Sequence, residues 1–113
     1  MAKYEGVLQG DFDEILSAVE SGILRGSASA SLEEGSDYHT EEIRCAVRVF
    51  ERYSIIGKNR VSLNVTLFSD GREVFLSAIA SGGSQAMFFK INTFGEQAFL
   101  NQIVEIAERY RVR

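Results

Sequence analysis

The feature that most constrains the fold of this chain is a strict alternation of apolar and other side chains along residues 61–68. Its core-facing positions are Val61, Leu63, Val65 and Leu67. A period of two is typical of a β-strand that turns one face to a core. The dipeptide Asp70-Gly71 follows closely, and Asp-Gly is a strong two-residue hairpin signal. The sequence therefore predicts an antiparallel hairpin whose second strand covers residues 73–80.

Further strands are predicted on both sides of this hairpin, from short alternating or β-prone segments bounded by turn residues. The six predicted strands cover residues 3–8, 27–32, 43–55, 61–68, 73–80 and 85–91. The acidic stretch 33–42 has no apolar period, and a loop is the predicted structure there.

Two amphipathic helices are predicted, each opened by a capping box. Asp11 with Glu14 opens the first, and apolar residues then recur with helical spacing. Thr93 with Glu96 opens the second, a long C-terminal helix. The expected fold is a single α+β domain over residues 1–113. It is a six-stranded, mostly antiparallel sheet packed on the long C-terminal helix, with the N-terminal helix after strand 1.

The lengths of the turns predict which residues pair across the strands, and therefore which side chains share a face. A two-residue turn at 70–71 places Leu67 opposite Val74, and a three-residue turn at 57–59 places Val49 opposite Leu67. One continuous apolar face results, and we expect it to pack on the helices.

The same pairing leaves a second face that is also partly apolar, with basic residues among the aromatic ones. The candidate interface consists of Arg44, Arg48, Phe50, Arg52, Phe68, Phe75, Ile79, Phe88 and Lys90. A solvated sheet face should be polar, so we expect something to cover this one. The sequence leaves three alternatives for what covers this face: the N-terminal helix, a second copy of the chain, or a ligand or macromolecular partner. A second copy is favoured, which predicts a homodimer or higher homo-oligomer.

A second candidate site is a pocket between the sheet and the C-terminal helix, which would take a small apolar ligand. Its candidate lining is Glu51, Tyr53, Gln85, Met87, Phe89 and Phe99. Glu51 and Gln85 are the polar residues on the predicted core face. An enzyme would need Glu51 to be accessible to water with a perturbed pKa. Pairing with a nearby arginine is the commoner role of such a residue, so no enzymatic activity is predicted.

The composition disfavours several kinds of protein. A net charge of −4 disfavours binding of nucleic acid or anionic lipid over a broad surface. The chain has no apolar run of about 18 residues, we expect no leader peptide from its first residues, and its single cysteine agrees with a reducing compartment. A cytoplasmic protein is therefore expected. With one histidine, one cysteine and no phosphate-binding or dinucleotide motif, we expect no metal and no cofactor.

Three segments carry a resemblance to known proteins: residues 44–53 (RCAVRVFERY), 81–86 (SGGSQA) and 88–96 (FFKINTFGE). In them the chain resembles a small uncharacterised family, a domain of unknown function, from Gram-positive bacteria. The order strand–helix–strands–helix is similar to the helix-grip or TATA-binding-protein-like architecture. This resemblance implies no activity and no site residues. The function expected from the residues is a non-enzymatic, self-associating interaction module.

Overall fold

The computed structural model describes residues 1–54, 59–82 and 89–113, including all of their side chains except those of residues 89–94. Five strands and two helices are present in this part of the chain. In order they are β1 (Ala2–Leu8), α1 (Phe12–Arg25), β2 (Ser31–His39), β3 (Arg44–Ser54), β4 (Asn59–Ser69), β5 (Val74–Gly82) and α2 (Phe89–Glu108). The α+β class is as predicted, with five antiparallel strands in place of six.

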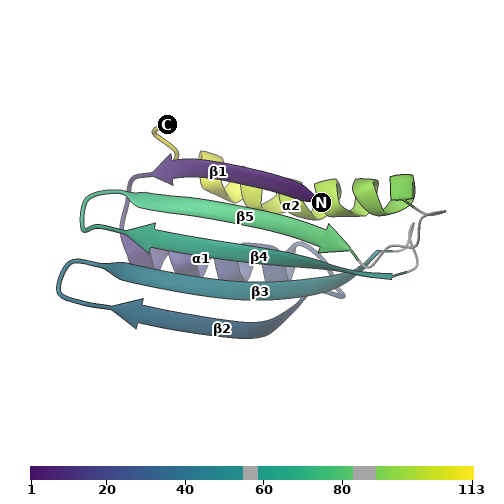
Figure 1. Cartoon of the computed structure of the whole chain (residues 1–113), viewed down its shortest axis with the longest axis horizontal. Helices are drawn as coiled ribbons and strands as arrows, with labels where there is room; N and C mark the ends of the chain where they lie inside the picture. The colour runs from purple at the N-terminus through teal and green to yellow at the C-terminus, as the bar shows by residue number, and fades with distance from the viewer. Residues whose placement is uncertain (55–58, 83–88) are drawn as a thin grey trace.

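The sheet is built around β4, with the strand order β1-β5-β4-β3-β2 (Figure 1). Strands β2 to β5 form an antiparallel meander, and β1 adds to its far edge beside β5. The connection through α1 therefore carries the chain from one edge of the sheet to the other. Residues after α2 return to β1, where the Val112 amide donates a hydrogen bond to the Val7 carbonyl at 2.9 Å.

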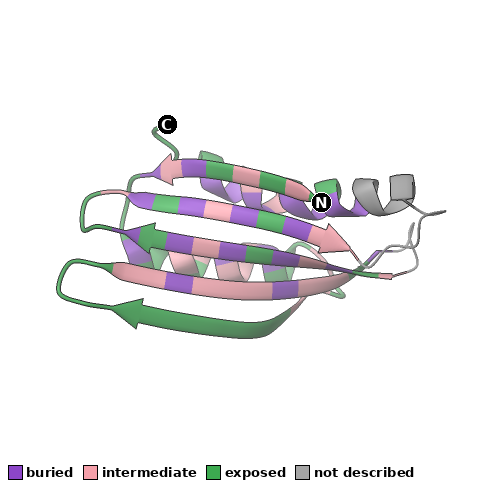
Figure 2. Ribbon diagram, in the orientation of Figure 1, coloured by how far each residue is buried: buried purple, intermediate pink, exposed green. Residues whose placement is uncertain are grey.

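Both helices lie on the same side of the sheet, behind it in Figure 1. α2 packs on β1, β4 and β5, α1 lies over β2 and β3, and the helices contact each other. Large side chains buried between the layers include Phe50, Phe99, Leu8, Ile15, Ile23, Leu63, Leu67, Leu76 and Ile103. No described element covers the opposite face of the sheet, which is turned to the viewer in Figure 2. We call it the outer face, and its exposure excludes the N-terminal helix as its cover.

The first helix begins as its capping box predicts. The Asp11 carboxylate accepts a hydrogen bond from the Glu14 amide at 3.0 Å, which satisfies one of the unpaired donors of the first turn. The buried residues of α1 are Phe12, Ile15, Val19 and Ile23, the stripe expected from the helical spacing. This prediction is confirmed.

The prediction of a sixth strand at residues 85–91 is wrong, since α2 already begins at Phe89. Residues 85–88 lie outside the described part of the chain. The capping box at Thr93 and Glu96 does not open α2, because four residues of the helix precede Thr93. A short apolar run such as 88–91 is compatible with a strand or with a buried helix, so periodicity alone does not decide between them.

The acidic stretch predicted to be a loop is instead most of β2. This strand extends over Ser31–His39, and eight of its nine residues are exposed. It pairs with β3 alone and has a register shift between Leu32 and Glu34. Because both of its faces are largely in water, β2 needs no apolar alternation, and the pattern used to predict strands is absent from it.

The predicted pairing of β4 with β5 is displaced by two residues. Leu67 pairs with Leu76, and the last pair before the turn is Ser69 with Val74. The connection is therefore the four residues 70–73, in which Gly71 has a φ of 99°. A shift of two leaves every side chain on its predicted face, so Phe68 and Phe75 do lie on the outer face.

The predicted pairing of β3 with β4 is displaced by three residues, and this error inverts the faces of β3. Val49 pairs with Asn64 rather than with Leu67, and pairing ends with Ser54 opposite Asn59. An odd shift moves each side chain of a strand to the other face. The even-numbered residues of β3, including Arg48 and Phe50, therefore lie on the helix side.

Candidate interaction surface

A row of apolar and aromatic side chains crosses the outer face from one edge of the sheet to the other. Each of the five strands contributes one member, and the strand pairings place them side by side: Val7, Phe75, Phe68, Cys45 and Tyr38. We call this set the outer row. Its aromatic members are substantially exposed, with 39% for Phe75, 42% for Phe68 and 65% for Tyr38.

The rest of the outer face mixes apolar, hydroxyl and charged side chains. The next row contains Glu5, Ser77, Thr66, Val47 and Ser36, and the row after it contains Lys3, Ile79, Asn64, Val49 and Glu34. In this third row the cationic residue lies on β1 and the anionic one on β2, at opposite edges of the sheet. The face therefore combines an apolar row with separated charges of both signs.

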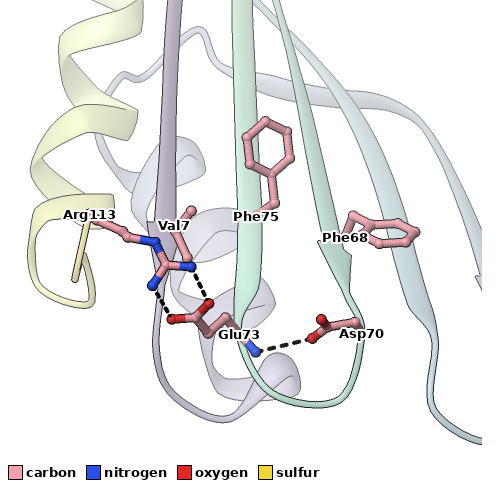
Figure 3. Close-up of a pocket in the computed structure, with 6 residues that line it drawn as sticks. All are labelled: Val7, Phe68, Asp70, Glu73, Phe75 and Arg113. Carbon is pink, nitrogen blue, oxygen red and sulfur yellow. Dashed lines mark hydrogen bonds and ion pairs between the residues drawn. The ribbon is translucent and has the colours of Figure 1, made fainter.

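One end of the outer row borders a depression of about 140 Å³ (Figure 3). Val7, Phe68 and Phe75 form its apolar side, and Asp70, Glu73 and Arg113 form its charged side. The Arg113 guanidinium binds both oxygens of Glu73, at 2.6 and 2.8 Å. The amides of Arg72 and Glu73 donate to the carboxylate of Asp70, which lowers the pKa of Asp70 below its ordinary value. Asp70 thus stabilises the turn at the end of the row.

The residues of the predicted interface are divided between the two sides of the sheet. Phe68, Phe75 and Ile79 lie on the outer face, where Ile79 is 39% exposed. Arg44, Arg48, Phe50 and Arg52 lie on the helix side, because of the three-residue shift in the pairing of β3. Phe88 lies outside the described residues, and Lys90 belongs to α2 with a side chain that is not described. The predicted mixture of arginine and phenylalanine on one face is therefore wrong.

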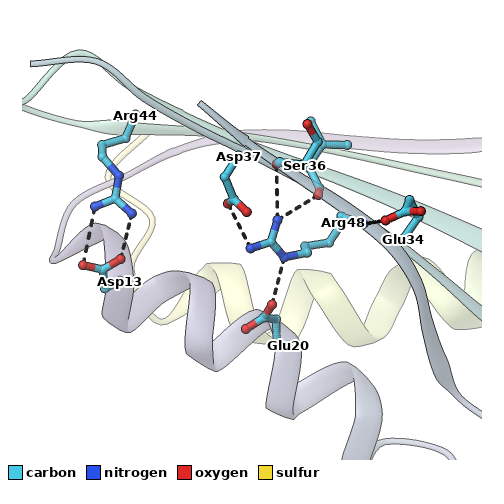
Figure 4. A network of polar contacts seen from close by, with 9 residues as sticks. Asp13, Glu20, Glu34, Ser36, Asp37, Arg44 and Arg48 are labelled. Carbon is cyan, nitrogen blue, oxygen red and sulfur yellow. Dashed lines mark hydrogen bonds and ion pairs between the residues drawn. The ribbon is translucent and has the colours of Figure 1, made fainter. Parts of the chain in front are cut away.

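The arginines of β3 connect the sheet to the helices instead (Figure 4). Arg44 pairs with Asp13 of α1 at 2.8 Å. Arg48, with a side chain only 11% exposed, reaches Glu20 of α1 at 2.8 Å and Asp37 of β2 at 2.9 Å. These contacts leave neither guanidinium on the outer face, where a partner could bind it.

The third arginine of β3 has a different environment. The guanidinium of Arg52 lies over the ring of Phe99, 4.8 Å from its centroid, an arrangement that gives a cation–π attraction. Burial lowers the pKa of Arg52 below its ordinary value. Like the other two, it packs against the helix layer.

The residues predicted to line a ligand pocket are also separated by the sheet. Glu51 and Tyr53 lie on the outer face, where Glu51 pairs with Arg60 at 2.8 Å and Tyr53 is 44% exposed. Phe99 is fully buried on the helix side. Gln85 and Met87 lie outside the described residues, and the side chain of Phe89 is not described. Of the described members, Phe99 therefore does not share a cavity with Glu51 or Tyr53.

Three members of the outer row were not predicted: Val7, Cys45 and Tyr38. The pairing of Val49 with Leu67 predicted from the sequence would turn Cys45 toward the core, whereas the structure puts it half-buried on the outer face. Tyr38 lies in the segment that was predicted to be a loop. Only the strand pairing could have located them. Val7 joins the row through the pairing of β1 with β5, and Cys45 and Tyr38 join it only when β2 is a strand and β3 is in its observed register.

Within the described ranges, no group of three or more histidine, cysteine, aspartate or glutamate side chains could hold a metal ion. No helix in these ranges is long and apolar enough to cross a membrane.

Comparison with known proteins identifies a family for this chain. No curated protein and no solved structure matches the chain. A family described as a family of unknown function (DUF6054) matches residues 1–111, nearly the whole length. The chain therefore belongs to this family of unknown function.

Proposed function

We propose that this protein is a non-enzymatic interaction module that self-associates through the outer face of its sheet. The observation that carries the proposal is the outer row, which is apolar across all five strands on the side that the helices leave uncovered. A sheet face that stays in water is normally polar. Exposed apolar patches of this kind mark interaction surfaces.

The size of the face suits a second copy. Five strands about 4.8 Å apart and nine residues at about 3.3 Å each give a plan area of roughly 700 Å². A specific interface of ordinary size buries about 800 Å² on each partner. Aromatic residues are enriched in the buried centres of such interfaces, and the outer row contributes Phe68, Phe75 and Tyr38 at one end of the face.

Other partners fit the surface less well. Binding to the phosphates of nucleic acid requires basic side chains, and the three arginines of β3 lie on the helix side with partners there. The depression beside Phe68 is small compared with the 300–1,000 Å³ or so of ordinary ligand sites. As part of the same proposal we place the protein in the bacterial cytoplasm, which its single cysteine supports.

Light scattering coupled to size-exclusion chromatography, over a concentration series, tests the proposal. The wild-type protein should be a dimer or a larger assembly, and the Phe68→Glu/Phe75→Glu variant should be a folded monomer. The matched control is Leu24→Glu, because Leu24 has a similar exposure of 38% but lies on α1, away from the outer face. A wild-type protein that stays monomeric at its highest soluble concentration would refute self-association. A double variant with unchanged mass would show that another surface is responsible.

A further inference from the structure

We infer that two copies associate face to face about a two-fold axis that runs along β4, with Lys3 of each copy paired to Glu34 of the other. This inference rests on the proposed function and adds the orientation of the second copy. It comes from the position of the outer row and of the two charges on the sheet, and from the central place of β4 in the strand order.

The symmetry of a face-to-face pair leaves few choices. A two-fold axis that relates two stacked sheets must lie in the plane between them, and its simplest orientations are along the strands or across them. An axis along β4 places β4 on β4, β5 on β3 of the second copy, and β1 on its β2. Residues at the same level of the strands stay at the same level. An axis across the strands instead places each strand on its own counterpart and reverses the levels.

With the axis along β4, the outer row packs on the reversed outer row of the second copy. Phe68 then lies over the second Phe68, Phe75 over Cys45, and Val7 over Tyr38. Every one of these contacts joins an apolar or aromatic side chain to another. The row buries itself completely in this orientation, as an isologous interface requires.

The charges agree with the same orientation. Two rows further along the strands, Lys3 on β1 lies over Glu34 on β2 of the second copy, and Ile79 lies over Val49. The two-fold axis generates the ion pair twice. An axis across the strands would place β1 on β1, where the outer face carries both Lys3 and Glu5, and β2 on β2, where the outer-face residues Glu34, Ser36 and Tyr38 offer the second Glu34 no cation. Facing like charges destabilise a complex, so the axis along β4 is favoured.

In a single copy, the side chains of Lys3 and Glu34 are both accessible for this contact. The Lys3 side chain is 62% exposed, and its ammonium lies 3.9 Å from the carboxylate of Glu5. Glu34 is exposed, and its carboxylate accepts a hydrogen bond from the Gly35 amide at 3.0 Å; among the described residues it forms no ion pair. Stacked sheets are commonly rotated by about 30°, which would incline the axis by about 15° to β4, and the long side chain of lysine accommodates the displacement that this rotation causes at the edges.

Charge exchange at these two positions tests the orientation. Lys3→Glu and Glu34→Lys should each raise the dimer dissociation constant by roughly ten-fold, because two rim ion pairs become two repulsive contacts. The combined Lys3→Glu/Glu34→Lys variant restores both pairs and should return to within about three-fold of wild type. Arg109→Glu changes the net charge by the same amount as Lys3→Glu and is its control, since Arg109 is an exposed residue just after α2. Sedimentation equilibrium measures the dissociation constants of the wild-type protein and of the four variants.

The outcomes separate this inference from the proposed function. Weakening by both single changes with recovery in the combined variant supports the axis along β4. If Phe68→Glu/Phe75→Glu disrupts the dimer but the charge-exchange variants leave its dissociation constant unchanged, the orientation is refuted and self-association is not. Weakening without recovery also overturns it. A monomeric wild-type protein overturns both.

Discussion

Replacing Arg48 by alanine should lower the free energy of unfolding by about 3 kcal/mol. Alanine lacks two methylenes of the buried arginine stem, worth about 0.8 kcal/mol each. The guanidinium donates four hydrogen bonds, to Glu20, to Asp37 and to the carbonyls of Val47 and Ser36. Losing them should add about 1–2 kcal/mol. The total stays moderate because the Glu20 and Asp37 side chains are 33% and 60% exposed and regain water when the arginine is removed.

The variant Arg48→Met separates the two contributions. Methionine keeps an apolar stem of similar length but donates no hydrogen bond, so its cost should be only about 1–2 kcal/mol. Urea unfolding followed by circular dichroism measures both variants. The Phe68→Glu/Phe75→Glu background is suitable because association would otherwise add to the apparent stability.

The opposite result would refute the observed faces of β3. In the register predicted from sequence, Arg48 lies on the surface, where a substitution usually changes stability by no more than about 0.5 kcal/mol. A cost of that size for Arg48→Ala would therefore contradict its burial between α1 and the sheet. Equal costs for alanine and methionine would show instead that the hydrogen bonds, and not the stem, carry the contribution.

Two further predictions use the same unfolding assay. Phe50→Ala should cost about 3–5 kcal/mol because Phe50 is fully buried, whereas Val49→Ala should cost about 1 kcal/mol or less since Val49 is only partly buried; a reversed order would contradict the face assignment. The hydrogen bond from Arg44 lowers the pKa of Asp13 below its ordinary value of 3.8, so its contribution to stability is present above that pH and is lost as pH falls through the lower pKa of the folded state. Asp13→Asn should therefore reduce the loss of stability on acidification, and an unchanged pH profile would count against this pair.

The elements that could be predicted from sequence are those with complete local signals. α1 has both a capping box and an apolar stripe, and β4 has a strict alternation, so both were placed correctly. β2 has neither signal. It pairs along one edge only and both of its faces are exposed to water, so its fold does not require alternating apolar and polar residues. The start of α2 was missed for a related reason, since a short apolar run fits a helix and a strand equally well.

The candidate surface depended on a quantity that local patterns do not determine. Turn residues locate a turn to within a residue or so, which is enough to establish that β3 and β4 pair. An error of an odd number of residues in that location moves every side chain of a strand to the opposite face. The side-chain pattern of β3 does not reveal such an error, because both of its faces are partly apolar. Cys45, Val47 and Val49 alternate with Ala46 and Phe50, so either assignment gives a plausible core.

The arginines of β3 explain why the outer face can be apolar while the helix side carries charge. Arg44, Arg48 and Arg52 recur every four residues and form one line along the helix side of β3. Arg44 lies over the ring of Phe12 of α1, 4.4 Å from its centroid, and Arg52 lies over Phe99 of α2, while Arg48 reaches Glu20. Their long stems cover apolar surface and their heads find partners on the helices.

The line of arginines therefore belongs to the contact between the sheet and the helices, and its presence is accounted for within one copy of the chain. The contacts within one copy of the chain do not explain the outer row in the same way. Its five members come from five strands, lie on the side that no described element covers, and expose aromatic rings to water. Folding alone gives no reason to collect them there, since the core on the other side is complete without them. The proposed association with a second copy would supply that reason.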